Sequence, residues 1–410
     1  MPGVRRIMLQ PNNAWNLILS HTVHLPTTRQ DLRESLGFVL AEDVRADRDI
    51  PPSHHSSMDG YAVRSSDVTN GPCSLRLIGE IAAGSSSRPR VGAGACARIL
   101  TGANVPPGAD SVVPVEETEE SNGYVKVLSA VKRGANVLTQ GQDARKGVTL
   151  LHKGTVMGAS EIGVCATVGK ATIQVHDRPR IALLCTGAEL RGIEAPVRRH
   201  ELRDSNGPTL AATLSHWGFR DITRQIVPDR VNRLVSVIRQ KGRQCDVILL
   251  TGGMSVGKYD VVREAIEKAG ATVYVHGVAM KPGKPFLFAT LPGDRFIFGL
   301  PGNPLSALTA FHEFVLPALR RLSGMAPKAS RPSLRLPLAA PLTSKGELVR
   351  FILGRLRWEE SGPSVTAVAS QSSADLVSAL KADGAIVFPA DVREMKSGDL
   401  VEFRPWRTLP

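Results

Sequence analysis

The sequence predicts a multidomain protein that combines α/β and β architecture. We expect a doubly wound, mainly parallel αβ domain, a β-rich second domain, a helical N-terminal segment and a C-terminal β-barrel. Three observations support this fold class. The 410 residues exceed what one hydrophobic core usually holds. Residues 178–324 alternate strand-like and helix-like segments, and much of the flanking sequence consists of short alternating runs separated by turn residues.

The sequence pattern in the first part of the chain changes twice, from helical to β-type and back to helical. Residues 13–40 carry apolar side chains at helical spacing, namely Trp15, Ile18, Leu19, Leu32, Leu36 and Leu40. Residues 47–147 are rich in Gly, Pro, Val and Ser and predict β-structure, and residues 150–168 return to a helical pattern. We therefore expect a helical domain made of residues 1–45 and 145–177, interrupted by a β-rich domain at residues 46–144.

The αβ domain is predicted at residues 178–326. Strands are expected at 181–184, 222–227, 247–250, 272–276, 287–289 and 296–298, with helices near 207–217, 230–241, 260–269 and 304–322. Domains of this kind bind ligands at the carboxyl ends of their parallel strands. Residues 327–410 return to short β runs at 333–338, 349–356, 385–388 and 400–403, which predict the small barrel.

Composition narrows the class of protein. There is no apolar run of about 18 residues, and residues 1–13 lack an apolar signal core, so we expect a cytoplasmic protein with no membrane partner. The five cysteines stand far apart without a CxxC pair, which favours reduced, mostly buried thiols.

The net charge of +13 raises the question of nucleic-acid binding. The basic residues are scattered in pairs, aromatic residues are few, and no recognition helix, RRM or zinc-finger pattern occurs. A basic surface or an anionic small substrate is therefore favoured over nucleic acid.

A glycine-rich loop is the most informative local feature. The segment Thr251-Gly252-Gly253-Met254-Ser255-Val256-Gly257-Lys258-Tyr259-Asp260 follows a predicted strand and precedes a predicted helix. Glycines allow backbone amides to approach a phosphate, and the helix N-terminus favours negative charge. The loop therefore predicts an oxyanion site. It is not a Walker A motif, because Tyr259 occupies the position of the Mg²⁺-binding hydroxyl.

Cationic and acidic side chains follow other predicted strands. Lys281 and Lys284 lie in Lys281-Pro282-Gly283-Lys284-Pro285, and Pro301-Gly302-Asn303-Pro304 leads into a helix; both loops suit anion binding. Glu189, Asp229 and Asp260 fall at the same sheet edge, where carboxylates suggest Mg²⁺ bridging a pyrophosphate. Asp229 and Asp260 also suit helix capping, and the two roles are compatible.

Some polar residues leave both a site role and a structural role open. Asp204 and Asn206 fit a site or a turn equally well. His54 and His55 are adjacent on an extended loop and have no third ligand in view, so a metal site there is disfavoured.

The motifs together resemble one family. In chain order they are Ser57-Met58-Asp59-Gly60-Tyr61-Ala62, Arg98-Ile99-Leu100-Thr101-Gly102-Ala103, Gly141-Gln142-Asp143, Thr186-Gly187-Ala188-Glu189-Leu190, the loop at 251–260, the motif at 281–285 and Leu300-Pro301-Gly302-Asn303-Pro304. This series is similar to that of the molybdopterin molybdenumtransferases, called MoeA in bacteria and represented by the gephyrin E domain in animals. The resemblance spans the whole chain and implies that the αβ domain is of the molybdopterin-binding type.

The resemblance implies a reaction and an assembly. These enzymes insert molybdate into adenylylated molybdopterin with Mg²⁺-dependent release of AMP. The resemblance also implies a homodimer of four-domain subunits, in which the β-rich domain of one subunit faces the partner's αβ and C-terminal domains across a shared cleft. A molybdopterin adenylyltransferase and molybdoenzyme maturation proteins are the further partners that such a role suggests.

The resemblance also assigns site residues. Catalytic roles are implied for Asp59, Thr101, Asp143, Glu189 and Asp260, and Mg²⁺ binding for Glu189, Asp229 and Asp260. Substrate contacts are implied for Gly252, Gly253, Ser255, Gly257, Lys281, Lys284, Pro301, Gly302, Asn303, Pro304, Ser306, Arg350 and Ser373. The chain departs from the family at Met254, where Val is more usual, and at residues 370–375, which lack glycine and add Asp375.

Two other readings of function stay open at this point. An adenylyltransferase of the same pathway resembles the αβ domain alone, and the flanking β motifs argue against it. The second alternative is a catalytically weak pterin-binding paralogue or scaffold, because a protein can keep the fold and the binding loops after it has lost catalytic activity. The joint presence of Asp59, Asp143, Glu189 and Asp260 favours an active enzyme.

Overall fold

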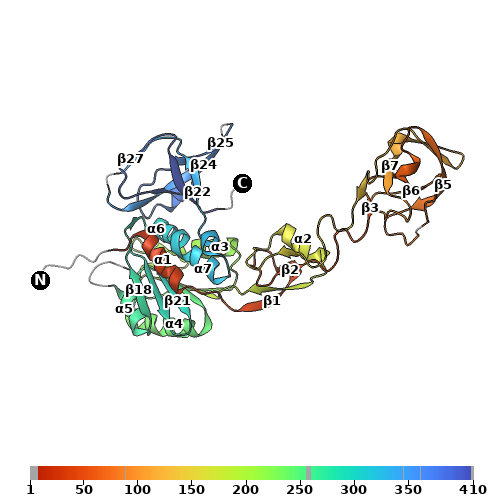
Figure 1. Ribbon diagram of the computed structural model, residues 1–410. Coiled ribbons are helices and arrows are strands. Elements are labelled where there is room, and N and C mark those ends of the chain that lie inside the picture. Colours follow the sequence, from red (N-terminus) through yellow and green to blue (C-terminus); the bar gives the residue numbers. More distant parts are fainter. Residues whose placement is uncertain (1–7, 88, 255–259, 345, 361, 408–410) are drawn as a thin grey trace. The chain divides into compact units, whose positions relative to one another are not determined.

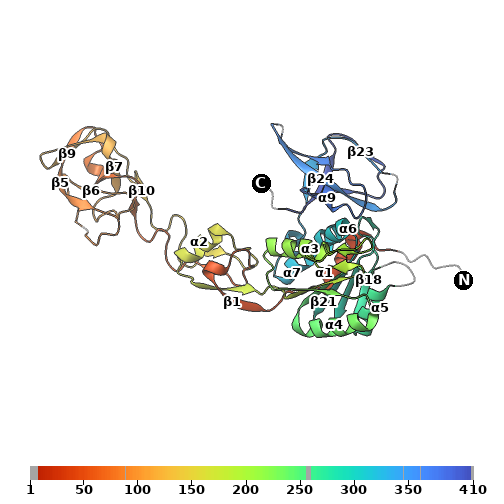
Figure 2. The same ribbon diagram turned by 180° about the vertical axis from the view of Figure 1, so that it is seen from behind.

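The computed structural model describes residues 8–87, 89–254, 260–344, 346–360 and 362–407. The chain divides into two units (Figures 1 and 2). Unit 1 contains Met1–Arg29, Gly37–Ala41 and Gln174–Pro410, and unit 2 contains Gln30–Leu36 and Glu42–Ile173. No helix in the described part of the chain is long and apolar enough to cross a membrane.

A six-stranded mixed sheet forms the centre of unit 1. Its order is β16 (Ile222–Val227), β13 (Ile181–Thr186), β17 (Val247–Thr251), β21 (Arg295–Leu300), β20 (Leu287–Leu291) and β18 (Thr272–His276). The first four strands are parallel, as expected, and β20 runs antiparallel to both of its neighbours, β21 and β18. Strand β18 therefore has the direction of the first four strands, and the sheet is mainly parallel with β20 as its reversed strand. Only residues 292–294 connect β20 to β21, and a connection this short can form a hairpin but not a parallel crossover.

Helices cover both faces of this sheet (Figure 1). Their bounds are α1 (Pro11–His21), α3 (Asn206–His216), α4 (Val231–Gln244), α5 (Val261–Lys268), α6 (Pro304–Ala310), the π-helical segment η4 (Phe311–Val315) and α7 (Leu316–Leu322). Along β13, Ile181 and Leu183 point into the core under α1, α3, α6 and α7, while Ala182 and Leu184 point into the core under α4 and α5. This alternation buries both faces of the strand, which explains its continuous apolar sequence.

The helical expectation for residues 13–40 is wrong beyond His21. Helix α1 ends there, and the chain continues as β1 (Thr27–Asp31) and the 3₁₀ turn η1 (Leu32–Glu34). Pro26 and the β-branched pair Thr27-Thr28 disfavour helix at this point. Helix α1 packs into the core of unit 1 through Trp15 and Ile18.

The expected helix at residues 150–168 is also shorter than its pattern. The segment contains β11 (Thr149–Leu151) and α2 (Ala159–Thr167), separated by a turn in which Gly154 takes a φ of +93°. That left-handed backbone conformation ends the strand and is open to glycine at little cost.

Unit 2 is β-rich, as the composition predicts. Its main sheet has the order β7 (Ser111–Pro114), β4 (Gly60–Val63), β6 (Ala95–Ile99), β5 (Cys73–Ile81), β9 (Tyr124–Val127) and β8 (Thr118–Ser121). Short ladders pair β10 (Val137–Leu138) with β3 (His55–Ser56), and β11 with β2 (Val44–Arg45). Side chains on the two faces of the sheet form two small apolar cores, one around Tyr61 and Val113 and the other around Ile99 and Val112.

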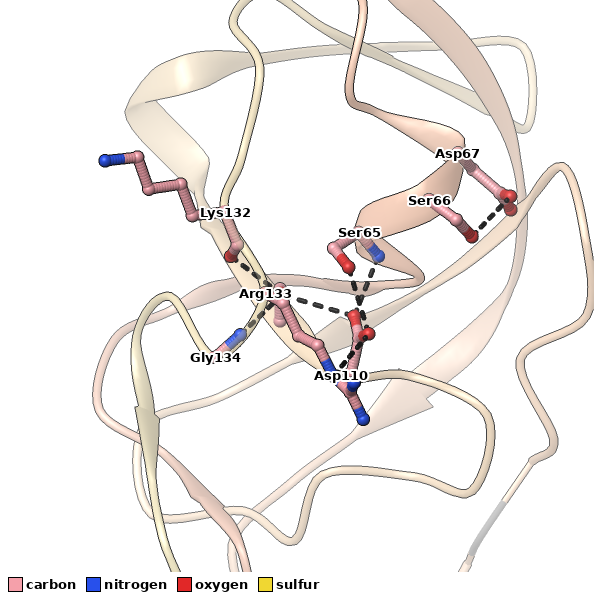
Figure 3. Close-up of polar contacts among 8 residues, drawn as sticks. Ser65, Ser66, Asp67, Asp110, Lys132, Arg133 and Gly134 are labelled. Atoms are coloured by element: carbon pink, nitrogen blue, oxygen red, sulfur yellow. Dashed lines mark hydrogen bonds and ion pairs between the residues drawn. The ribbon is translucent and has the colours of Figure 1, made fainter.

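One carboxylate organises a corner of unit 2 (Figure 3). Asp110 accepts hydrogen bonds from the backbone N–H of Ser65 at 2.7 Å and from the Ser65 hydroxyl at 2.9 Å. Its other contacts are the Ser111 hydroxyl at 3.2 Å and Arg133 Nε at 3.5 Å. Asp110 therefore ties together the 3₁₀ turn η2 (Ser65–Asp67), the start of β7 and the loop that contains Arg133.

The C-terminal part of unit 1 forms a second sheet. Its order is β19 (Met280–Lys281), β24 (Val349–Glu359), β26 (Gly384–Phe388), β28 (Leu400–Pro405) and β22 (Leu334–Pro337), and β25 (Gly362–Ala367) pairs with β24. A single bridge between Leu338 and Val365 connects the end of β22 with β25. The two sides of the sheet thus approach each other. Among the described residues this bridge, and not a full ladder of paired residues, closes the expected barrel.

The remaining elements are short or connect these sheets. They are η3 (Val115–Glu117), β12 (Thr172–His176), β14 (Leu190–Arg191), β15 (Leu202–Arg203), α8 (Pro327–Ser330), β23 (Leu342–Thr343), α9 (Leu376–Ala379) and β27 (Glu394–Met395).

Candidate functional site

A pocket of about 600 Å³ lies at the carboxyl edge of the unit 1 sheet. Loops that follow β13, β16, β17 and β21 contribute Glu189, Asp229, Gly252 and Gly302. These four strands are parallel, so their carboxyl ends meet at one edge, where ligands of such sheets bind. The complete wall consists of Glu189, Asp229, Gly252, Gly253, Met254, Val261, Met280, Lys281, Pro282, Gly283, Lys284, Pro285, Pro301, Gly302, Asn303, Ser306, Leu348 and Ser373.

The glycine-rich loop needs glycine for a steric reason. Gly252 has a φ of +86°, and a Cβ there would lie 2.0 Å from the carbonyl oxygen of Thr186. A Cβ on Gly302 would lie 3.4 Å from Gly252 Cα, so the loops after β17 and β21 approach closely. Any larger residue at position 252 would push β13 and β17 apart. Of the predicted oxyanion contacts in this loop, Ser255 and Gly257 lie outside the described residues.

Cationic groups gather on one side of the pocket. Lys281 and Lys284 are exposed, and neither lies within ion-pair distance of a carboxylate in the part of the chain that the structure describes. Strands β19 and β24 pair in parallel with Lys281 opposite Arg350, which brings a third cation to the same ladder. Arg350 is not part of the pocket wall, and its Nη1 lies 3.5 Å from Ser344 Oγ.

The three predicted acidic ligands separate in the structure. Glu189 and Asp229 line the pocket, and Asp260 does not. Asp260 begins α5, where it accepts a hydrogen bond from the backbone N–H of Arg263 at 2.9 Å and contacts His276 Nε2 at 2.9 Å. Across the described ranges no group of three or more His, Cys, Asp or Glu side chains is arranged to hold a metal.

The contacts of His276 define its tautomer. Arg263 Nη1 lies 3.3 Å from His276 Nδ1, and a guanidinium has no acceptor, so Nδ1 accepts and Nε2–H donates to Asp260. The Asp260 side chain is 7% exposed. The capping role expected for this residue is therefore filled in the structure.

Two pocket carboxylates can share a hard cation with a substrate. Mg²⁺ is usually held by one or two carboxylates together with substrate phosphates and water rather than by a closed protein cage. Glu189 and Asp229 supply oxygen donors of this kind, and they line the same pocket as Lys281 and Lys284. The donor set fits Mg²⁺ shared with a phosphate-bearing ligand.

The C-terminal segment is attached to the pocket rim. Asn303 Nδ2 donates to Ser373 Oγ at 2.8 Å, and the backbone N–H of Ser306 donates to the carbonyl of Ser373 at 3.1 Å. Asp375 turns away and caps α9 by accepting from the N–H of Ser378. Its carboxylate therefore adds no charge to the pocket wall, and Ser373 lines the pocket as predicted.

Other predicted residues at this edge have structural roles. Pro304 begins α6 and does not line the pocket. Asp204 is buried and accepts from the N–H of Gly207 at 2.8 Å, which is a turn role. Asn206 Nδ2 donates to the carbonyl of Gly302 at 2.8 Å and so holds the rim loop.

Three predicted residues lie in unit 2. Asp59 accepts hydrogen bonds from the backbone N–H and the hydroxyl of Thr101, each at 2.7 Å. These two bonds hold the pKa of Asp59 below its usual value. Asp143 is exposed, and its carboxylate has no hydrogen-bond partner among the described residues. Asp59 and Thr101 thus form a pair, whereas Asp143 presents a carboxylate that is available to a ligand.

The adjacent histidines of unit 2 bind to backbone groups. His54 Nδ1 accepts from the N–H of Gln140 at 3.2 Å, and His55 Nδ1 lies 2.8 Å from the carbonyl of Gly102. The two rings therefore engage different segments.

Sequence reasoning missed several pocket residues. Met254 and Pro285 lie within motifs that were identified and Met280 precedes one, so their position beside Gly253, Lys284 and Lys281 was an available signal. Leu348 reaches the pocket only because β19 pairs with β24, and His276 contacts Asp260 from a neighbouring strand. Neither contact has a signal in a single sequence.

None of the five cysteines forms a disulfide, and four of them are buried. Burial raises the pKa of the Cys96 and Cys185 thiols to about 12, which keeps them protonated and unreactive.

Three family models match the chain. Residues 9–169 match the MoeA N-terminal region (domain I and II), residues 182–321 match the probable molybdopterin binding domain, and residues 335–406 match the MoeA C-terminal region (domain IV).

Full-length relatives agree with these matches. The chain is 30% identical to the molybdopterin molybdenumtransferase of Staphylococcus epidermidis over 403 residues, covering 97% of this chain and 96% of that protein. It is 33% identical to that of a Nostoc species over 405 residues, covering 97% and 92%. A crystal structure of the molybdopterin biosynthesis MoeA protein of Pyrococcus horikoshii has 27% identity and a TM-score of 0.80, covering 98% of this chain and 100% of that chain.

Proposed function

We infer the reaction from the family, because the chain belongs to the MoeA family of molybdopterin molybdenumtransferases, which are transferases of molybdenum cofactor biosynthesis. We propose that it inserts molybdate into adenylylated molybdopterin and releases AMP. The observation that carries this proposal is the pocket wall, which holds Glu189 and Asp229 together with Lys281 and Lys284, two lysines that have no carboxylate partner among the described residues.

The cationic side of the pocket suits the anions of this reaction. Molybdate is a dianion, and adenylylated molybdopterin carries a pyrophosphate, so binding both requires unpaired cations and amide donors. Lys281 and Lys284 supply the cations at the rim, with Arg350 beside them on β24. When the phosphoanhydride opens, negative charge grows on the departing AMP, and ammonium groups held at that point stabilise it.

Glu189 and Asp229 would hold Mg²⁺ together with the pyrophosphate. When bound, Mg²⁺ neutralises phosphate charge and polarises the phosphorus–oxygen bonds. Without such a cation two carboxylates would repel the substrate, so their presence in a pocket for anions supports a shared metal.

Unit 2 would supply the remaining groups. We propose that the Asp59–Thr101 pair and the exposed Asp143 complete a cleft shared between the subunits of a homodimer, each subunit having the domains 1–45 with 145–177, 46–144, 178–326 and 327–410. The free carboxylate of Asp143 supports a direct role, and the hydrogen-bonded carboxylate of Asp59 supports a positioning role. The cytoplasmic location and the further protein partners remain predictions from the sequence.

Reconstitution tests the proposed reaction. The purified protein is mixed with adenylyl-molybdopterin, molybdate and Mg²⁺, and AMP is measured by chromatography. We expect AMP release that requires both molybdate and Mg²⁺, and that stops in excess EDTA.

Other outcomes of this experiment would contradict the metal assignment or the reaction. Rapid AMP release in EDTA would contradict the metal assignment, and release without molybdate would indicate a simple hydrolase. Tight pterin binding without any AMP release would favour the scaffold reading.

A further inference from the structure

The loop that carries Asp143 is tied to residues 49–54 by a dense set of hydrogen bonds. The backbone N–H groups of Gly141 and Asp143 donate to the carbonyls of Pro51 and Ile50, each at 3.0 Å. The N–H of Ala144 also donates to Ile50, whose own N–H donates back to Ala144 at 2.8 Å. These bonds fix the path of the loop while its side chain at position 143 stays exposed.

Asp49 secures this loop at both ends. Its Oδ1 accepts from the backbone N–H of Lys146 at 2.9 Å, and its Oδ2 accepts from Gln140 Nε2 at 2.8 Å. The same two bonds, the Lys146 bond first, hold the pKa of Asp49 below its usual value. Gly141 lies between them, and a Cβ there would come 3.4 Å from Asp49 Cγ. The carboxylate therefore spans the loop from the residue at 140 to the residue at 146.

His54 adds a contact on the side of Gln140. Its Nδ1 accepts from the backbone N–H of Gln140 at 3.2 Å, so this nitrogen carries no proton. Gln140 is therefore held twice, through its side chain by Asp49 and through its main chain by His54.

We propose that Asp49 is a positioning residue for Asp143, with His54 in a supporting role. The proposal rests on the proposed function, in which Asp143 contributes a free carboxylate to the cleft. That carboxylate has no partner among the described residues of its own chain, so the backbone of the loop, which sets the direction of the Cα–Cβ bond, decides the space that the carboxylate can reach. A displacement of about 1 Å at a catalytic group lowers the reaction rate steeply. We therefore expect turnover to depend on the two hydrogen bonds that Asp49 accepts from Gln140 and Lys146, which we call the brace.

The first experiment compares Asp49→Asn with Asp43→Asn. Asparagine keeps the shape of the side chain but has one acceptor oxygen and no charge, so the bond from Lys146 weakens, and contact with Gln140 survives only if the Gln140 amide turns its oxygen toward Asn. Asp43 is a matched control, because its Oδ1 accepts from the backbone N–H of Lys153 at 2.9 Å elsewhere in unit 2. We expect Asp49→Asn to lower kcat by about tenfold or more with KM within about twofold, and Asp43→Asn to leave both unchanged.

A structural role and a positioning role give different results. Equal shifts in Tm for the two variants, with a loss of kcat only in Asp49→Asn, would support positioning. A loss of kcat that follows the loss of Tm in both variants would overturn the proposal. His54→Ala should lower kcat less than Asp49→Asn, and His54→Asn, which places an acceptor near the Nδ1 position, should restore it.

A double-variant test shows whether Asp49 acts through Asp143. In the Asp143→Asn background, Asp49→Asn should cause no further fall in the residual rate, because the group that it positions is already lost. Multiplied losses would show that Asp49 acts independently of Asp143 and would overturn the proposal.

Amide hydrogen exchange separates this inference from the proposed reaction. Exchange at residues 140–146 should speed up in Asp49→Asn and not in Asp43→Asn, whatever the protein catalyses. If the wild type released no AMP but exchange still changed in this way, the proposed reaction would be contradicted. The role of Asp49 in holding the loop would still be supported. Unchanged exchange would refute the brace even in an active enzyme.

Discussion

The two units use their carboxylates differently. In unit 1 two buried acids, Asp246 and Glu313, contact guanidinium groups: Asp246 contacts Arg180 Nε at 3.0 Å and Arg295 Nη1 at 3.1 Å. In unit 2, Asp49, Asp59 and Asp110 mainly accept hydrogen bonds from backbone N–H groups and from uncharged side chains, and so hold loops. Asp246 and Glu313 of unit 1 therefore form buried ion pairs, whereas Asp49, Asp59 and Asp110 of unit 2 hold loops of a β-rich domain.

The two units also differ in net charge. Unit 1 contains 36 Lys and Arg against 22 Asp and Glu, a net +14, and unit 2 contains 15 against 16, a net −1; together they give the +13 of the chain. The excess positive charge therefore belongs wholly to the unit that contains the pocket lined by Lys281 and Lys284. A field of this sign raises the local concentration of anionic substrates. The high pI of the protein, which the reaction alone does not explain, is a property of this unit.

The largest expected effect concerns a buried ion cluster in unit 1. Glu313, whose side chain is 1% exposed, contacts Arg331 Nη2 at 2.6 Å and Arg404 Nε at 3.5 Å. Removing the carboxylate in Glu313→Ala leaves the buried guanidinium of Arg331 without its carboxylate partner and leaves Arg404 with only the partly exposed Glu402. We expect the free energy of unfolding of unit 1 to fall by about 3–5 kcal/mol, measured by urea denaturation with probes in each unit.

The control for that variant is Glu402→Ala. Glu402 also pairs with Arg404, at 2.9 Å, but its side chain is 38% exposed. An exposed pair contributes about 1 kcal/mol or less. Equal losses in the two variants, or a loss in the unit 2 transition, would break the contrast between buried and exposed acids.

The second prediction concerns the unpaired cations of unit 1. Lys281→Ala and Lys284→Ala should each lower kcat/KM for AMP release by about 10²–10³, while the free energy of unfolding changes by about 0.5 kcal/mol or less. The reason is that both side chains are exposed and have no carboxylate partner among the described residues. Initial rates and urea denaturation give the two readouts.

Lys268→Ala is the matched control, because Lys268 is an exposed lysine of unit 1 that pairs with Glu264 outside the pocket. Lys281→Arg should recover part of the activity by keeping the charge. Parallel losses of activity and stability in Lys281→Ala would make the lysine structural.

The sequence predicted the αβ core more closely than its surroundings. All six strands of the main sheet were placed, and the strand predicted at residues 222–227 matches β16 at both ends. Strands buried on both faces are continuous apolar runs, which a single sequence displays directly. The reversal of β20 was not predicted, because it depends on the three-residue connection at 292–294.

The pocket was predictable where a motif lies on one loop. The glycine loop, the lysine pair and Asn303 could be placed because each follows its own strand. Asp260 does not line the pocket, and its contact with His276 of β18, 16 residues later in the chain, was not foreseen; its role as a metal ligand stays a prediction. Register between distant strands decides such contacts, and composition carries no record of it. The same limit applies to Leu348 and to the Lys281–Arg350 pairing.

The smallest predicted effect tests the unit 2 side of the comparison. Burial alone would raise the pKa of Asp110, but hydrogen bonds from the backbone and hydroxyl of Ser65 and from Ser111 outweigh it, so the pKa is lowered (Figure 3). A lowered folded-state pKa stabilises the fold above the unfolded-state value, and that stability is lost as the pH falls through the folded-state pKa. We expect Asp110→Asn to reduce the free energy of unfolding of unit 2 at neutral pH by about 1–2 kcal/mol, and the gap to wild type to narrow below about pH 4. Asp67→Asn is the control with fewer contacts and should cost less, because the Asp67 carboxylate accepts from the N–H of Gly94 and from the adjacent Ser66 hydroxyl, and asparagine keeps one acceptor oxygen. A gap that stayed constant to about pH 2 would show that the charge on Asp110 contributes nothing, and a fall in the unit 1 transition would show that the two units do not unfold separately.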